Sequence, residues 1–232
     1  MDNMLIKYSF FILFLPLLAF VIQIFFGKKL PRQGDWVSIL AIVTTLILAL
    51  IMFVIMILNY NPNFKNEASF TWLDMGAFKI ELGFLVDNVT IIMLLVVALI
   101  STCTHIFSTQ YLKGDIRYSR YFAYLGLFTF SMNGIVLANN LMSMYMFWEL
   151  VGVSSYLLIG HWFEKESAAN ASKKAFLTNR VGDIGFFIGI MLIYTAIGSF
   201  AFSDIFSGVS AGLIKGSTLT ITGVGLFLGA MG

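Results

Sequence analysis

Long apolar runs separated by short polar segments dominate this chain of 232 residues. A membrane-spanning helix needs roughly 20 mostly apolar residues. The pattern therefore predicts an all-α, polytopic transmembrane helix bundle with six full spans, at residues 5–26, 36–58, 84–111, 121–138, 141–162 and 175–197. A seventh run begins near Thr218 and is still apolar at Gly232, which indicates a truncated span and a fragment of a longer protein.

The polar connections divide the chain into a first pair of helices (1–58), an extramembrane loop (59–83) and a second helical region (84–232). Within the loop, residues 78–82 alternate between apolar and charged side chains, which favours a strand and a small surface hairpin. Segment 202–215 has the composition of an amphipathic or coiled loop.

Composition supports the membrane assignment, because 59% of the residues are hydrophobic and only 11% are charged. Soluble domains typically carry about 25% charged residues, so the bilayer must solvate the outside of this fold. The net charge of +2 gives no basis for nucleic-acid binding. The single cysteine, Cys103, excludes a disulfide framework or four-cysteine metal site and is read as a packing residue.

Lysine and arginine are distributed unequally between the two sides of the predicted bundle. One side holds Lys7, Lys65, Lys79 and Lys215, and the other holds the remaining ten of the 14 basic residues. Basic residues favour the cytoplasmic side. We therefore expect an integral protein of a bacterial inner membrane whose amino terminus lies on the outer, periplasmic side.

Glu149 is the leading candidate for chemistry, because it lies near the middle of the predicted fifth span with no Lys or Arg within one helical turn. Burying a charge at the bilayer centre costs at least about 2.5 kcal/mol, and intramembrane carboxylates commonly mark ion pathways. We expect a proton-binding carboxylate whose charge depends on a cation from another helix. The alternative is a neutral, hydrogen-bonded carboxylic acid with a structural role.

The predicted sixth span opens with Lys173, Lys174, Arg180 and Asp183. Arg180 and Asp183 are three residues apart and are expected to pair on one helix face. Lys173 is expected to reach the lipid headgroups, whereas Lys174 is either an interface anchor or part of a proton entry path.

Three other polar positions have competing interpretations. His105, inside the third span, is either a proton relay or a structural residue satisfied by Thr104, Ser108 or Thr109. Asp87 is expected to stabilise a helix start. His161 and Glu164 flank the fifth helix and are expected to be solvated.

Several motifs in order resemble the antiporter-like membrane subunits of respiratory complex I, in particular chain 5 (subunit L) of NADH–quinone oxidoreductase. They are YSRYFAY at 118–124, FWELVGVSSYLLIG at 147–160, KAF at 174–176 and TNRVGD at 178–183. The resemblance implies that Glu149 is the central proton-pump carboxylate and that a lysine on the seventh, broken helix modulates it. It also makes residues 84–232 the beginning of the proton-translocating domain.

The resemblance further implies an enzyme subunit that carries no cofactor of its own and receives energy from redox chemistry elsewhere in the complex. Its expected partners are other complex I membrane subunits, the lipid bilayer and protons. One alternative is the large subunit of a multisubunit Na⁺/H⁺ antiporter, although Arg180 and Asp183 favour the complex I subunit. A second alternative is a membrane scaffold that does not pump.

Overall fold

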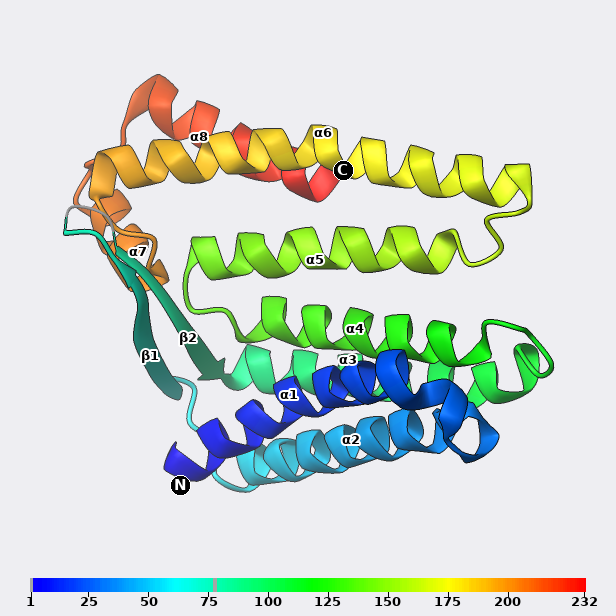
Figure 1. Ribbon diagram of the computed structural model, residues 1–232. Helices are drawn as coiled ribbons and strands as arrows, with labels where there is room; N and C mark the ends of the chain where they lie inside the picture. Colours follow the sequence, from blue (N-terminus) through cyan, green and yellow to red (C-terminus); the bar gives the residue numbers. More distant parts are fainter. Residues whose placement is uncertain (1, 77–78) are drawn as a thin grey trace.

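A computed structural model of the chain describes residues 2–76 and 79–232. Six long helices lie side by side along one direction (Figure 1). They are α1 (Asp2–Phe26), α2 (Asp35–Leu58), α3 (Asn88–Tyr111), α4 (Tyr118–Leu137), α5 (Leu141–Ile159) and α6 (Glu166–Ile197). Shorter elements complete the fold: the 3-10 turns η1 (Gly27–Lys29) and η2 (Pro31–Gly34), strands β1 (Lys65–Asp74) and β2 (Lys79–Asp87), and helices α7 (Phe202–Ser210) and α8 (Gly216–Met231).

Within the described residues, five helices are long and apolar enough to cross a membrane: α1, α2, α3, α5 and α6. The chain is therefore an integral membrane protein. Helix α4 is long enough but less apolar, because it packs between α1 and α5 and faces protein on both sides. Its buried surface includes Ser119, Thr129, Ser131 and Asn133, which a lipid-facing helix could not carry.

The contact between α1 and α4 is organised around a proline. Pro16 lies inside α1, where its missing N–H leaves the carbonyl group of Ile12 without its helical partner. The side-chain amide of Asn133 donates a hydrogen bond to that oxygen at 3.1 Å. A Cβ at Gly126 would lie 3.1 Å from the Pro16 carbonyl oxygen, so the glycine permits this close approach.

The 59–83 region contains an antiparallel pair of strands, β1 and β2, with an irregularity in register between Thr71 and Leu73. The strand predicted at 78–82 overlaps β2, although Phe78 lies outside the described residues. Strand β2 continues to Asp87, so the prediction that the third span begins at Phe84 is wrong. Residues 84–87 pair with β1 instead, and Asp87 caps α3 by accepting a hydrogen bond from the Thr90 N–H at 2.7 Å.

Two other helix boundaries differ from the prediction. Helix α5 ends at Ile159 rather than at residue 162, and α6 begins at Glu166 rather than at residue 175. A helix of 32 residues is about 48 Å long, longer than the ~30 Å hydrocarbon core. The first turns of α6, which include Lys173 and Lys174, therefore extend from the apolar part of the bundle.

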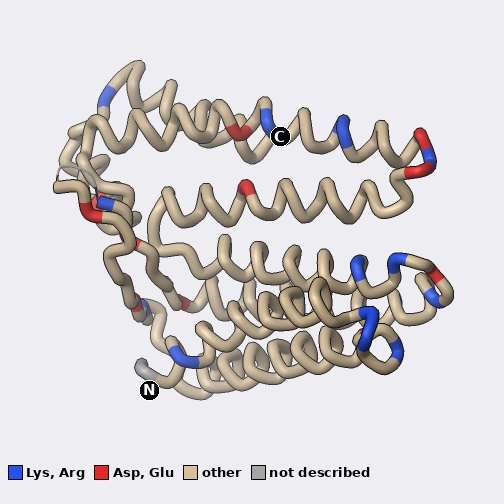
Figure 2. Tube along the Cα trace, viewed as in Figure 1, with Lys and Arg blue, Asp and Glu red and all other residues tan. Residues whose placement is uncertain are grey.

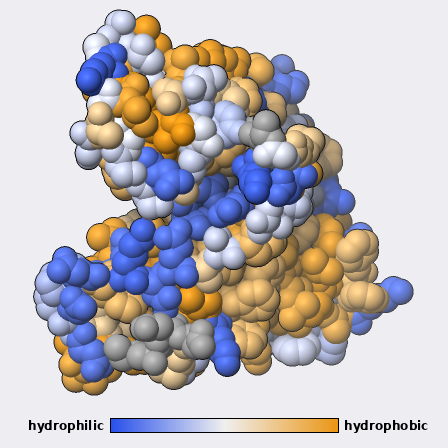
Figure 3. Space-filling model, turned by 90° about the vertical axis from the view of Figure 1, so that its left-hand side faces the viewer, coloured by the Kyte–Doolittle hydropathy of each residue, from blue (hydrophilic) through white to orange (hydrophobic). Residues whose placement is uncertain are grey.

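The two ends of the bundle differ in charge. Lysine and arginine residues gather at the end where α1, α3 and α5 finish (Figure 2), which we call the basic end. The opposite end, the hairpin end, carries β1, β2 and α7. Hydrophilic residues gather over this face, and hydrophobic residues cover the adjoining sides (Figure 3).

Candidate functional site

Glu149 lies half-way along α5. The helix begins at Leu141, and Asn140 caps it by accepting a hydrogen bond from the Ser143 N–H at 2.8 Å. The Asn140 amide also donates to the Glu81 carbonyl oxygen at 2.8 Å, which ties the start of α5 to the hairpin. Glu149 is thereby held at a fixed depth in the bundle.

Arg180 of α6 forms an ion pair with Glu149 through Nη1 and Oε2. The second carboxylate oxygen of Glu149 accepts a hydrogen bond from the Tyr145 hydroxyl at 2.8 Å. The side chains of Glu149 and Arg180 are 23% and 30% exposed, so most of the surface of each side chain is covered by other residues. The cation that faces Glu149 here therefore comes from α6.

The expected pairing of Arg180 with Asp183 is present, with Arg180 Nη1 3.8 Å from Asp183 Oδ2. Asp183 is nevertheless the more distant of the two carboxylate neighbours of Arg180, because Glu149 lies closer. The other oxygen of Asp183 accepts a hydrogen bond from the Trp148 indole N–H at 3.0 Å. Arg180 thus lies between two carboxylates, one on α5 and one on its own helix.

Aromatic packing between α5 and α6 sets this geometry. The Tyr145 ring lies 5.7 Å from that of Phe186, and the Trp148 ring lies 5.5 Å from the same phenylalanine. Tyr145, Trp148 and Glu149 are three and four residues apart, so they share one face of α5. The Arg180 guanidinium also lies over the Phe176 ring at 4.6 Å. The roles of Tyr145 and Trp148 were not predicted from the sequence, although Trp148 lies in the motif at 147–160 and Tyr145 lies two residues before it.

Lys174 and His105 lie apart from this cluster. Lys174 is exposed on α6, and its side chain forms no ion pair with any residue that the structure describes. His105 is fully buried between α3 and α4. Its Nδ1 lies 2.8 Å from the Ser101 carbonyl oxygen, and the Ser101 hydroxyl is 2.7 Å from that of Thr129. The prediction that Thr104, Ser108 or Thr109 contacts His105 is wrong, because Ser101 makes this contact.

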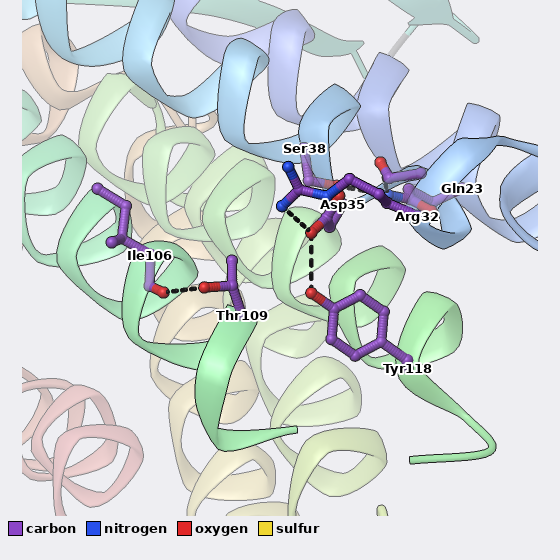
Figure 4. Close-up of polar contacts among 8 residues, drawn as sticks. Gln23, Arg32, Asp35, Ser38, Ile106, Thr109 and Tyr118 are labelled. Atoms are coloured by element: carbon purple, nitrogen blue, oxygen red, sulfur yellow. Dashed lines mark hydrogen bonds and ion pairs between the residues drawn. The ribbon is translucent and has the colours of Figure 1, made fainter. Parts of the chain in front are cut away.

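A second polar cluster, which the sequence analysis did not identify, joins α2 to α4 at the basic end (Figure 4). Asp35 is only 2% exposed, and its Oδ2 accepts hydrogen bonds from Arg32 and from the Tyr118 hydroxyl, both at 2.9 Å. Arg32 and Gln33 have positive φ angles of 55° and 54°, which cost about 1–2 kcal/mol each. The ion pair between Asp35 and Arg32 stabilises this strained turn.

His161 is another buried polar residue at the basic end, and the expectation that it is solvated is wrong. It is 6% exposed, and its Nε2 lies 3.4 Å from Asp115 Oδ1. Burial lowers the pKa of the imidazole below its usual 6.5; Asp115 raises it in part, while Arg117 and Arg120 lower it. Glu164, in contrast, is exposed as expected and pairs with Arg117.

The lowered pKa of His161 predicts how stability depends on pH. Above pH 6.5 the imidazole is neutral in both the folded and unfolded states. As the pH falls below 6.5, the unfolded state takes up the proton first, so the folded state loses stability. We expect wild type to lose about 1 kcal/mol more than His161→Gln between pH 7.5 and 5.5, measured by thermal unfolding. The variant retains His105, so any difference between the two proteins comes from His161. Equal losses of stability in wild type and His161→Gln would contradict the prediction.

Comparisons with known proteins show which family the chain resembles. Residues 138–232 match the family described as NADH:quinone oxidoreductase/Mrp antiporter, TM, and residues 72–122 match NADH-Ubiquinone oxidoreductase (complex I), chain 5 N-terminus. The NADH-ubiquinone oxidoreductase chain 5 of Hypocrea jecorina is 41% identical over 221 residues, which cover 95% of this chain and 31% of that protein. The NAD(P)H-quinone oxidoreductase chain 5 of Synechocystis sp. is 43% identical over 162 residues, or 68% of this chain and 24% of that protein.

The chain thus spans less than a third of the length of these two relatives. A solved structure of a membrane-bound sulfane sulfur reductase, an archaeal respiratory membrane complex, has a similar fold. Its TM-score is 0.76 at 18% identity, over 95% of this chain and 43% of that chain. The chain belongs to the family of antiporter-like membrane subunits that includes chain 5 of NADH–quinone oxidoreductase.

Proposed function

We propose that this chain is part of a proton-translocating membrane subunit of NADH–quinone oxidoreductase, and that Glu149 takes up and releases the proton. The observation that carries the proposal is the position of Arg180 between the carboxylates of Glu149 and Asp183. A cation with two alternative anionic partners is a simple switch, because it can stabilise the charge on only one of them fully at a time.

The switch has two arrangements. With Arg180 on Glu149, the carboxylate is stabilised in its charged form, with Tyr145 donating to its other oxygen. When Arg180 moves toward Asp183, Glu149 loses its counter-ion in an apolar environment, where an unpaired charge is unfavourable. Glu149 then binds a proton, and the return of Arg180 expels it. The Trp148 hydrogen bond keeps Asp183 oriented to receive the guanidinium.

The resemblance to the family adds a second cation to this proposal, a lysine on the seventh, broken helix. The end of α8 packs tightly on α6: a Cβ at Gly182 would lie 2.7 Å from the Leu228 carbonyl oxygen and 2.9 Å from Gly232 Cα. Gly182 is the residue before Asp183. A lysine supplied there would compete with Arg180 for the carboxylates. Lys174 and His105 lie apart from Glu149. A proton that enters at Lys174 or is relayed by His105 would therefore need intermediate groups to reach Glu149.

The driving force would come from outside this chain. With Cys103 as its single cysteine, the sequence has no cysteine set for an iron–sulfur cluster, and we assign the redox groups to other subunits. The family description also covers Mrp antiporters, in which a sodium gradient would replace NADH oxidation. The match of residues 72–122 to the chain 5 family favours the complex I subunit.

We further propose six spans, with α4 as one of them, in a bacterial inner membrane with the basic end in the cytoplasm. Nine of the 14 basic residues lie toward that end, whereas Arg180 lies inside the bundle beside Glu149. Short loops rich in Lys and Arg stay on the cytoplasmic side. A reporter inserted after Lys29 should therefore be labelled only from the cytoplasm, and one between Asn61 and Asn63 only from outside. The reverse labelling of the two positions would contradict this orientation.

A further inference from the structure

Two cavities at the basic end share one wall. A cavity of about 460 Å³ lies where the start of α4 faces the end of α5 and the start of α6. Another of about 770 Å³ lies between the start of α4 and the end of α1. Arg117, Arg120 and Tyr124 line both cavities. Their spacing of three and four residues places them on one face of the helix, and we call them the α4 ridge.

The residues around the α4 ridge carry excess positive charge. Lys173 lines the smaller cavity, and Lys28 and Lys29 line the larger one. Among the described residues that line either cavity, none is Asp or Glu. Arg117 is paired with Glu164, whereas Arg120 and the three lysines form no ion pair within the described part of the chain. The two cavities therefore favour an anion.

The same surface also offers neutral hydrogen-bond donors and apolar contacts. The smaller cavity is lined by Tyr124 and Tyr156, which places two phenol hydroxyl groups beside the cations. Phe25 and Ile116 line the larger cavity and are 73% and 88% exposed. A ligand that fits both features has an anionic head and an apolar tail.

We propose that the α4 ridge binds the phosphate group of an anionic phospholipid, with Arg120 and Lys173 as its main charged contacts. Arginine forms strong, charge-assisted hydrogen bonds with phosphate oxygens. Basic pockets between membrane helices on the cytoplasmic side suit lipid headgroups, and the ridge lies at the end of the bundle that meets the headgroup layer. Phe25, in the last turn of α1 before Lys28, would contact the acyl chains, which a free phosphate ion lacks.

The test measures lipid binding to the full-length protein purified with its complex and stripped of lipid in a neutral detergent. Native mass spectrometry counts retained phosphatidylglycerol and phosphatidylcholine of matched chain length. Each basic residue near an anionic headgroup contributes about fivefold in affinity. The double variant Arg120→Gln/Lys173→Gln should therefore bind phosphatidylglycerol about 25-fold more weakly, with little change for phosphatidylcholine.

The matched control is Lys113→Gln/Lys165→Gln, which removes the same charge from the basic end but lies outside both cavities. It should bind phosphatidylglycerol within about twofold of wild type, because neither lysine lines a cavity that would hold the headgroup and a neutral detergent presents no anionic surface. Equal losses in the two double variants would overturn the site, and so would equal affinity for the two lipids. Saturation of the ridge by inorganic phosphate alone would assign it to a free anion and overturn the lipid.

Discussion

Replacing Arg180 with Gln should destabilise the protein by about 2 kcal/mol, because removing one partner of this partly buried ion pair leaves the charge of the other partner uncompensated. Here the loss affects Glu149 first, since its contact with Arg180 is the closer one, and Asp183 at 3.8 Å second. The change should be read from thermal unfolding of the full-length protein at neutral pH.

A double-mutant cycle identifies which carboxylate Arg180 stabilises. Adding Glu149→Gln to the Arg180→Gln variant should restore part of the lost stability, with a coupling energy of about 1–3 kcal/mol. The matched cycle with Asp183→Asn should give a smaller coupling, because that carboxylate also accepts the Trp148 hydrogen bond. Additive effects within about 0.5 kcal/mol for Glu149, or a larger coupling for Asp183, would contradict the arrangement.

Glu149→Gln should reduce proton pumping on the order of fifty-fold or more, because a proton that crosses this depth without a carboxylate meets a barrier of at least about 2.5 kcal/mol. The substitution keeps the size of the side chain and an oxygen for the Tyr145 hydroxyl, so the complex should still assemble. Glu149→Asp retains a titratable group and serves as the control. It should pump faster than Glu149→Gln, as measured in membrane vesicles.

The sequence could predict the helices, because twenty apolar residues in a row have few other stable structures in a bilayer. It also made Glu149 the leading candidate for chemistry, since a carboxylate in such a run is exceptional. Exact boundaries were harder to predict. Residues 84–87 are apolar enough to begin a span, yet they pair with β1. Helix α6 extends back to Glu166 through a polar stretch that hydropathy does not identify as helical.

The partners within the site could not be predicted from one sequence. The contact of Arg180 with Glu149 depends on how α5 and α6 are rotated against each other, which aromatic packing around Phe186 determines. Spacing along one helix predicted only the weaker neighbour, Asp183. Burial of His161 follows from the turn after α5 and its contact with Asp115, two segments that are distant in sequence.

The most direct test of the central claim is the ratio of protons pumped to NADH oxidised in inverted membrane vesicles that contain the full-length subunit in its complex. Wild type and Glu149→Gln are compared at equal amounts of assembled complex, without a sodium gradient. We predict NADH-driven proton uptake for wild type and a ratio of protons to NADH that is lower on the order of fifty-fold for the variant. An unchanged ratio in Glu149→Gln would contradict the role of Glu149 in proton transfer.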